Sequence, residues 1–119
     1  MTLLLPCALL QLADMVGKAC ERLTAANIPH NLFVADCGAR VFLFPNCFAE
    51  RKARGGIPDE VLSTQVDPAA FECAGHIVLK RQQDYDTITQ QSAWQLLSFA
   101  SCSKGCFREA VAASRAGDW

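Results

Sequence analysis

The spacing of apolar residues near the start of the chain predicts a helix over residues 8–25. Its apolar positions recur at steps of three and four and form one stripe: Leu9, Leu12, Val16, Ala19 and Leu23. Pro6 stands at a first-turn position, where proline is tolerated. We expect the helix to end before Pro29, because proline disfavours an α conformation in the residue that precedes it.

The next segment predicts a β-hairpin, with strands at 31–35 and 40–44. The turn between them, at 36–39, contains Gly38, which adopts positive φ without steric cost. Apolar side chains occupy both alternating sets of positions in each strand. Since strands of this kind are usually covered on both faces, we expect a helix on one face and more protein on the other.

The remaining pattern predicts a short helix at 47–53, a third strand at 71–79 and a polar turn at 84–86. Thr89 is a suitable N-cap for a helix that reaches Ala100, and a last helix is expected at 106–115. This order predicts an α+β fold. Its antiparallel sheet consists of the hairpin and the third strand, and it packs with three helices.

Composition limits the class of protein. With 119 residues, 51% hydrophobic and 19% charged, the chain is expected to be a single domain over 1–119, or a fragment of one, with a folded core. Its 11 basic and 12 acidic residues argue against a nucleic-acid partner, which would require a basic excess. No window holds the roughly 18–20 apolar residues of a membrane span, and no Lys or Arg precedes the apolar start as in a signal peptide.

Seven cysteines are many for this length, but their number is odd and no C-x-x-C occurs. Free thiols of a reducing compartment explain this pattern better than disulfides, so we expect a cytoplasmic protein. Cys102 and Cys106 are spaced to share a helix face, and a zinc site would need further ligands such as Cys73 and His76. Because no second ligand pair has zinc-like spacing, no metal and no cofactor are predicted.

The motifs of common catalytic sites are absent from the sequence. The two histidines, His30 and His76, lie 46 positions apart, and no nucleophile elbow, P-loop or dinucleotide-binding glycine motif occurs. We therefore predict no catalytic residue in this chain. His76 follows Gly75, which permits an unusual backbone path, so the imidazole is a candidate for ligand contact, although a structural role is the more common one.

Two basic clusters are candidates for phosphate binding, because guanidinium groups match phosphate oxygens. One contains Arg51, Lys52 and Arg54, and the other contains Lys80 and Arg81. The alternative is a solvated face whose charges pair with nearby acidic residues. The candidate nucleotide- or phosphate-binding residues are Arg51, His76, Lys80 and Arg81.

Over about residues 11–111, the chain resembles the C-terminal part of the GDP-L-galactose phosphorylases of plants and algae. The related GDP-D-glucose phosphorylases share this pattern, and both groups belong to the histidine-triad superfamily. The residues that carry the resemblance are Asn27–Asn31, Val34–Gly38, Arg40–Glu50, Glu60–Leu62, Thr64–Ala69, Glu72, Gly75–Arg81 and Ser92–Leu97. Their order and spacing make the match specific.

The resemblance implies a partial histidine-triad-like domain of a nucleotidyltransferase. Such enzymes cleave a GDP-hexose with phosphate to GDP and a hexose 1-phosphate, a step of ascorbate biosynthesis in plants, through a guanylylated histidine. The nucleophile lies in a His-x-His-x-Gln motif upstream of the matching region, and this chain lacks it. The chain is therefore expected to be inactive alone. Its implied partner is the missing catalytic N-terminal part, or a second copy bound through the apolar hairpin; the full enzyme takes GDP-hexose and phosphate.

Two other interpretations stay open at this point. In the first interpretation, the chain is a stand-alone, non-catalytic module that binds a protein or a nucleotide, and its hairpin then needs a covering partner. In the second, the chain is a zinc or redox module built on Cys102 and Cys106. One departure from the resemblance is Lys104-Gly105, where the family has acidic residues; this change predicts a weaker start of the last helix.

Overall fold

The computed structural model describes residues 6–115, which divide into two compact units. The terminal unit combines the chain up to Pro45 with the chain from Ser103 onward, and the central unit is the intervening segment, 46–102. The expectation that residues 1–119 form one domain or a fragment of one stays a prediction.

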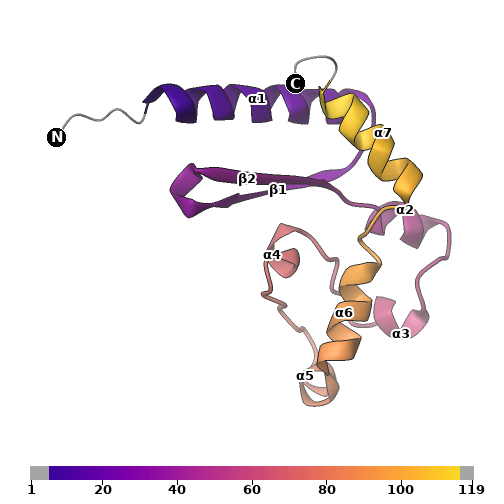
Figure 1. Ribbon diagram of the computed structural model, residues 1–119. Coiled ribbons are helices and arrows are strands. Elements are labelled where there is room, and N and C mark those ends of the chain that lie inside the picture. The colour runs from indigo at the N-terminus through magenta and orange to yellow at the C-terminus, as the bar shows by residue number, and fades with distance from the viewer. Residues whose placement is uncertain (1–5, 116–119) are drawn as a thin grey trace. The chain divides into compact units, whose positions relative to one another are not determined.

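The terminal unit contains helix α1 (Pro6–Ala25), strands β1 (His30–Ala35) and β2 (Arg40–Pro45), and helix α7 (Lys104–Arg115). The two helices pack together, and α1 runs alongside the hairpin (Figure 1). Ala19 and Leu23 of α1 and Ala110 of α7 are each exposed by 3% or less. The apolar stripe predicted for the first helix is thus the surface that its own unit buries.

The α1 helix ends where the sequence predicted. Asn27 takes a left-handed φ of 55°, and the amide of Ile28 donates back to the carbonyl of Leu23 at 2.9 Å. A left-handed residue of this kind closes the last helical turn and satisfies its carbonyl groups. Pro29 follows immediately, so the chain leaves the helix in an extended conformation that leads into β1.

The hairpin is confirmed, with a register that runs from His30 opposite Pro45 to Ala35 opposite Arg40. A single 3-10 turn, η1 (Asp36–Gly38), joins the strands, and Gly38 has a φ of 93°. The expectation that both faces are covered is wrong for the described chain. Four apolar side chains of the hairpin are exposed by 38–53%: Leu32, Phe33, Val34 and Phe42.

The central unit is helical. Its elements are α2 (Phe48–Ala53), α3 (Asp59–Leu62), α4 (Ala70–Cys73), α5 (Gln82–Thr87) and α6 (Gln90–Ser98). Phe48, Ile57 and Ala100 form its buried cluster, with Val61, Leu62 and Phe99 packed against it. The predicted helix at 47–53 is confirmed. So is the N-cap of α6, where the Ser92 amide donates to Thr89 Oγ1 at 3.1 Å.

Two predicted elements of the central unit are wrong. The third strand expected at 71–79 is instead the short helix α4, followed from His76 to Lys80 by chain without regular secondary structure. Glu72 Oε2 accepts the Ala69 amide at 2.9 Å, a local cap that favours the helix, and Gly75 with a φ of 96° ends it. The polar turn expected at 84–86 lies within α5.

The last helix begins at Lys104, two residues earlier than predicted. Ser103 Oγ accepts the Cys106 amide at 3.2 Å, so a serine cap supports a helix start that Lys104 and Gly105 favour poorly. Over residues 6–115 the fold is α+β, as predicted, but with a two-stranded antiparallel sheet and more than three helices. In this part of the chain no helix is both long and apolar enough to cross a membrane.

Candidate functional site

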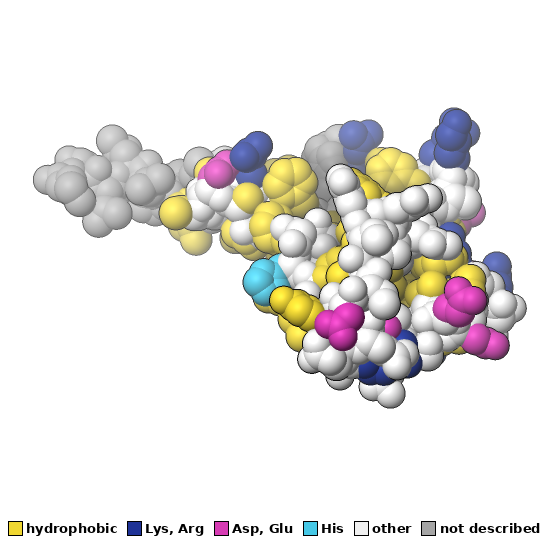
Figure 2. All heavy atoms as spheres, turned by 90° about the horizontal axis from the view of Figure 1, so that it is seen from below, with side chains coloured by type: hydrophobic (Ala, Val, Ile, Leu, Met, Phe, Trp, Pro, Cys, Tyr) yellow, Lys and Arg dark blue, Asp and Glu magenta, His cyan; other side chains and the backbone are white. Residues whose placement is uncertain are grey.

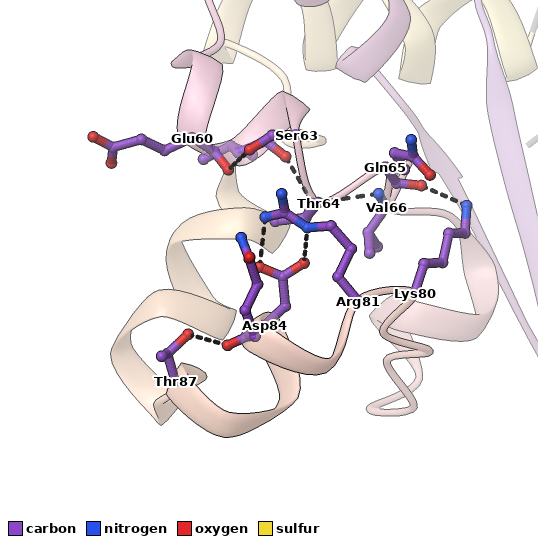
Figure 3. A network of polar contacts seen from close by, with 11 residues as sticks. Glu60, Ser63, Thr64, Gln65, Val66, Lys80, Arg81, Asp84 and Thr87 are labelled. Atoms are coloured by element: carbon purple, nitrogen blue, oxygen red, sulfur yellow. Dashed lines mark hydrogen bonds and ion pairs between the residues drawn. The ribbon is translucent and has the colours of Figure 1, made fainter.

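The predicted basic residue Arg81 is held by Asp84 across the first turn of α5 (Figure 3). Arg81 Nε and Nη2 donate to the two carboxylate oxygens of Asp84, both at 2.7 Å. The Asp84 side chain is only 13% exposed. The hydrogen bonds from Arg81 lower the pKa of the Asp84 carboxyl and raise the pKa of the guanidinium. Both members of this bidentate pair therefore stay charged across the neutral range.

Lys80, the preceding residue, points to a different partner. Its Nζ donates to the carbonyl of Gln65, a residue with a left-handed φ of 58° just beyond α3 (Figure 3). The Thr64 hydroxyl donates to Val61 O at 2.7 Å and accepts the Val66 amide at 3.3 Å in the same turn. Lys80 and Arg81 thus fasten two separate pieces of the chain rather than converge on one point.

Arg51 binds the C-terminal end of α6. Its Nη1 donates to the carbonyls of Phe99 at 2.6 Å and Ser98 at 3.1 Å, and its Nη2 donates to Ser101 O at 3.0 Å. The last carbonyls of a helix have no partners within the helix and carry the negative end of its dipole. A half-buried guanidinium satisfies them, so the cation predicted for phosphate already serves three carbonyl oxygens.

The other cations of the first basic cluster also face acidic groups. Arg54 Nη2 lies 2.7 Å from Glu50, and Lys52 Nζ lies 3.9 Å from Asp67. On the face drawn in Figure 2, Lys and Arg side chains stand among acidic and neutral ones. These contacts are the ones expected of a solvated face with paired charges.

His76 is exposed and lies against Phe71, with ring centroids 4.5 Å apart and a tilt of 51°. Its backbone amide donates to Phe71 O at 3.2 Å just after α4. Nearby, desolvation of the thiol and then the charge of Glu72 raise the pKa of Cys73. A thiol with a raised pKa is a weak nucleophile and a weak metal ligand at neutral pH.

A groove of about 270 Å³ lies in the central unit. Its lining residues are Glu60, Val61, Thr64, Asp84, Thr87, Ile88, Ser92, Gln95 and Leu96. The charged groups in this lining are the carboxylates of Glu60 and Asp84, and Asp84 is already paired with Arg81, so the lining offers no cation to an anion. None of the four predicted binding residues lines the groove, so it is not a phosphate site built from them.

One pair of neighbouring thiols was not predicted from the sequence. Cys47 and Cys102, both half-buried in the central unit, place their Sγ atoms 2.7 Å apart. The pair is separated by 55 residues, and no sequence signal links them. The pairing of Cys102 with Cys106 on one helix face is wrong, because Cys102 lies before α7 begins.

In this α+β chain, three of the four predicted binding residues, Arg51, Lys80 and Arg81, bind other groups of the chain itself. The family model described as GDPGP1-like, C-terminal domain, matches residues 4–114. This chain belongs to that family. The match confirms the resemblance to the C-terminal part of GDP-L-galactose phosphorylases.

Two proteins of Arabidopsis thaliana are similar to the chain. GDP-L-galactose phosphorylase 1 is 46% identical over 102 residues, which are 86% of this chain and 23% of that protein. GDP-L-galactose phosphorylase 2 is 46% identical over 98 residues, which are 82% of this chain and 23% of that protein. The chain thus spans less than a quarter of the length of these relatives. No solved structure matches it significantly.

Proposed function

We propose that this chain acts as the C-terminal section of a GDP-hexose phosphorylase. The observation that carries this proposal is the 46% identity over 102 residues to a GDP-L-galactose phosphorylase, at that enzyme's C-terminal part. The whole enzyme would transfer a guanylyl group from GDP-L-galactose or GDP-D-glucose to phosphate. It would act in the cytoplasm, as part of ascorbate biosynthesis.

The proposed role is to support catalysis rather than to perform it. The chain lacks a His-x-His-x-Gln motif, and Arg51 and Arg81 are engaged by the backbone and by Asp84. The nucleophile would come from the upstream part of the enzyme, with a histidine-triad-like fold. Any contact of Arg51, His76, Lys80 or Arg81 with the nucleotide would then require that part.

The partner proposed for this section is the catalytic part itself. Leu32 and Val34 leave apolar surface exposed on one face of the hairpin, and Phe42 does so on the opposite face. Exposed apolar patches of this kind mark interaction surfaces. Self-association of the chain through the hairpin is the alternative.

A chimaera tests this proposal. The C-terminal part of Arabidopsis GDP-L-galactose phosphorylase 1 is replaced by this chain, and release of GDP from GDP-L-galactose and phosphate is measured. The controls are the truncated Arabidopsis enzyme and this chain alone. We expect activity in the chimaera and none in either control. GDP release by the chain alone would contradict its supporting role. A folded chimaera no more active than the truncated enzyme would favour a stand-alone, non-catalytic binding module.

A matched pair of variants tests the hairpin as the contact surface. Val34→Lys places a charge on the hairpin at a side chain that is 53% exposed, and Leu10→Lys does so on α1 at one that is 66% exposed. Both should leave the isolated chain folded. We expect Val34→Lys to lower the activity of the chimaera at least tenfold and Leu10→Lys to change it less than twofold. Equal effects would argue against docking through the hairpin.

A further inference from the structure

The two sulfur atoms of Cys47 and Cys102 are 2.7 Å apart, although the residues are 55 positions apart in sequence. A disulfide forms without backbone movement only when the two side chains face each other at short range. Here the Sγ atoms are already in contact, so the Sγ–Sγ distance must shorten by less than ~1 Å to form the bond.

The surrounding backbone fixes this juxtaposition. The Cys47 amide donates to Ala100 O at 2.9 Å, which ties the residue before α2 to the segment after α6. Arg51 adds its three hydrogen bonds to carbonyls of the same segment. Phe48, which follows Cys47, and Ala100, two residues before Cys102, are buried, with exposures of 4% and 6%. The thiols are therefore held together by packing and hydrogen bonds from both sides.

We infer that Cys47 and Cys102 are a modification site, a dithiol that forms an intramolecular disulfide by exchange with a low-molecular-weight disulfide such as oxidised glutathione. This property goes beyond the proposed enzymatic role and does not depend on it. Half-buried sulfur atoms are accessible to a small peptide disulfide, and the neighbouring thiol resolves the mixed species.

The exchange is balanced in two steps. One protein thiolate attacks a sulfur of oxidised glutathione, a protein–glutathione bond forms, and the first glutathione leaves as a thiolate. The second protein thiolate then attacks the protein sulfur of the mixed disulfide and releases the second glutathione. Two protein thiols are oxidised, one glutathione disulfide is reduced to two thiols, and the two protons pass to the released glutathiones.

Peptide mapping of the full chain tests this inference directly. Trypsin cleavage after Lys and Arg places each of the seven cysteines on a different peptide, with Cys47 in 41–51 and Cys102 in 82–104. The folded protein is incubated with oxidised glutathione, remaining thiols are alkylated, and the digest is analysed by mass spectrometry without reduction. We expect peptides 41–51 and 82–104 to be joined in most molecules, ahead of all other pairs.

Variants and a denatured sample complete the test. Cys47→Ser or Cys102→Ser should abolish the linked peptide, whereas Cys73→Ser, at an exposed cysteine, should leave its yield unchanged. In concentrated urea the 47–102 pair should fall to the level of chance pairing. The inference is overturned if both cysteines remain reduced and are found alkylated, if glutathione remains bound to either one, or if another cysteine pair dominates. An equal yield in urea would overturn it too, since the fold would then not select the pair.

Discussion

At the scale of single residues, two arginines of this chain close helix ends. Arg22 donates to the carbonyls of Ser114 and Arg115 at the end of α7, and Arg51 does the same for α6. A guanidinium has several donors in a fixed plane, so one side chain reaches two or three carbonyl oxygens that the helix leaves without partners. Charge alone does not distinguish this use from phosphate binding.

Replacement of Arg51 by Ala should destabilise the central unit by about 1–3 kcal/mol, because three carbonyl groups lose a charged donor. Urea unfolding followed by Trp94 fluorescence, in a Trp119→Phe background, measures this loss. Arg54→Ala is the matched control. Its ion pair with Glu50 is exposed, so a change within about 0.5 kcal/mol is expected. Equal losses in both variants would show that the carbonyl contacts of Arg51 contribute little.

The Arg81–Asp84 pair should leave a pH signature on stability. The hydrogen bonds from Arg81 lower the pKa of Asp84 in the folded state, so the stabilisation is fully present above the unfolded-state value of about 4 and is lost as the pH falls through the lower folded-state pKa. Asp84→Asn should therefore be less stable than the unmodified chain at about pH 6. The difference in unfolding free energy should shrink as the solution is acidified.

Asp86→Asn provides the control for this titration, since Asp86 is exposed and accepts its hydrogen bond from the neutral amide of Gln82. At about pH 6 its unfolding free energy should differ from that of the unmodified chain by less than that of Asp84→Asn does, because the hydrogen bond it loses is exposed and not charge-paired. A constant difference between Asp84→Asn and the unmodified chain across the acid range would contradict the assignment.

The candidate residues could be chosen from the sequence, but most of their partners could not. Arg51 contacts carbonyls 47–50 positions away, and every residue offers a carbonyl, so no side-chain pattern reports the contact. Asp84 is different, because it follows Arg81 by three positions and is a visible charge partner. The contact of Cys47 with Cys102 depends on how the helices of the central unit fold back on themselves, which local patterns do not encode.

At the scale of elements, the sequence predicts those that carry their own local signals. The first helix has an apolar stripe and a proline stop, the hairpin has a glycine turn, and α6 has its Thr89 cap. The expected third strand had only apolar residues such as Ile77 and Val78. A strand also requires a partner to satisfy its backbone, and within the described residues this segment has none. The capped turn of α4 and Gly75 decide the local structure instead.

Glycine replacements in the terminal unit should have opposite effects on stability. Gly38→Ala should cost about 1–2 kcal/mol, because an L side chain is strained at a φ of 93° in the hairpin turn. Gly17 lies within α1, and apart from its chain neighbours and the backbone of its own helix, no atom of the described residues lies within 4 Å of the place that an added methyl group would take. Gly17→Ala should therefore stabilise the helix by about 0.5–1 kcal/mol. Circular dichroism during urea unfolding measures both. The turn assignment fails if Gly38→Ala is neutral or stabilising.

At the scale of the whole molecule, a crosslink between Cys47 and Cys102 would close a loop of 55 residues. Loop closure of this size lowers the entropy of the unfolded chain and is worth about 4 kcal/mol in the chain-entropy model. The oxidised protein should therefore unfold at a higher urea concentration than the reduced protein, with the shift confined to the Trp94 signal of the central unit. The shift should be absent in Cys102→Ser. A lower midpoint on oxidation would mean that the bond distorts the native unit.

The adjacency of the two ends of the central unit has a consequence for the architecture of the chain. Cys47 and Ala100 are joined by a backbone hydrogen bond, so the polypeptide leaves the terminal unit after β2 and returns beside its point of departure before α7. The central unit is thus an insertion in the topological sense, and its ends have the spacing that domain insertions favour. Excision of residues 46–102, with a short Gly-Ser bridge between Pro45 and Ser103, should leave α1, the hairpin and α7 able to assemble on their own. Residues 46–102 could then be replaced by another segment without a change in the topology of the terminal unit.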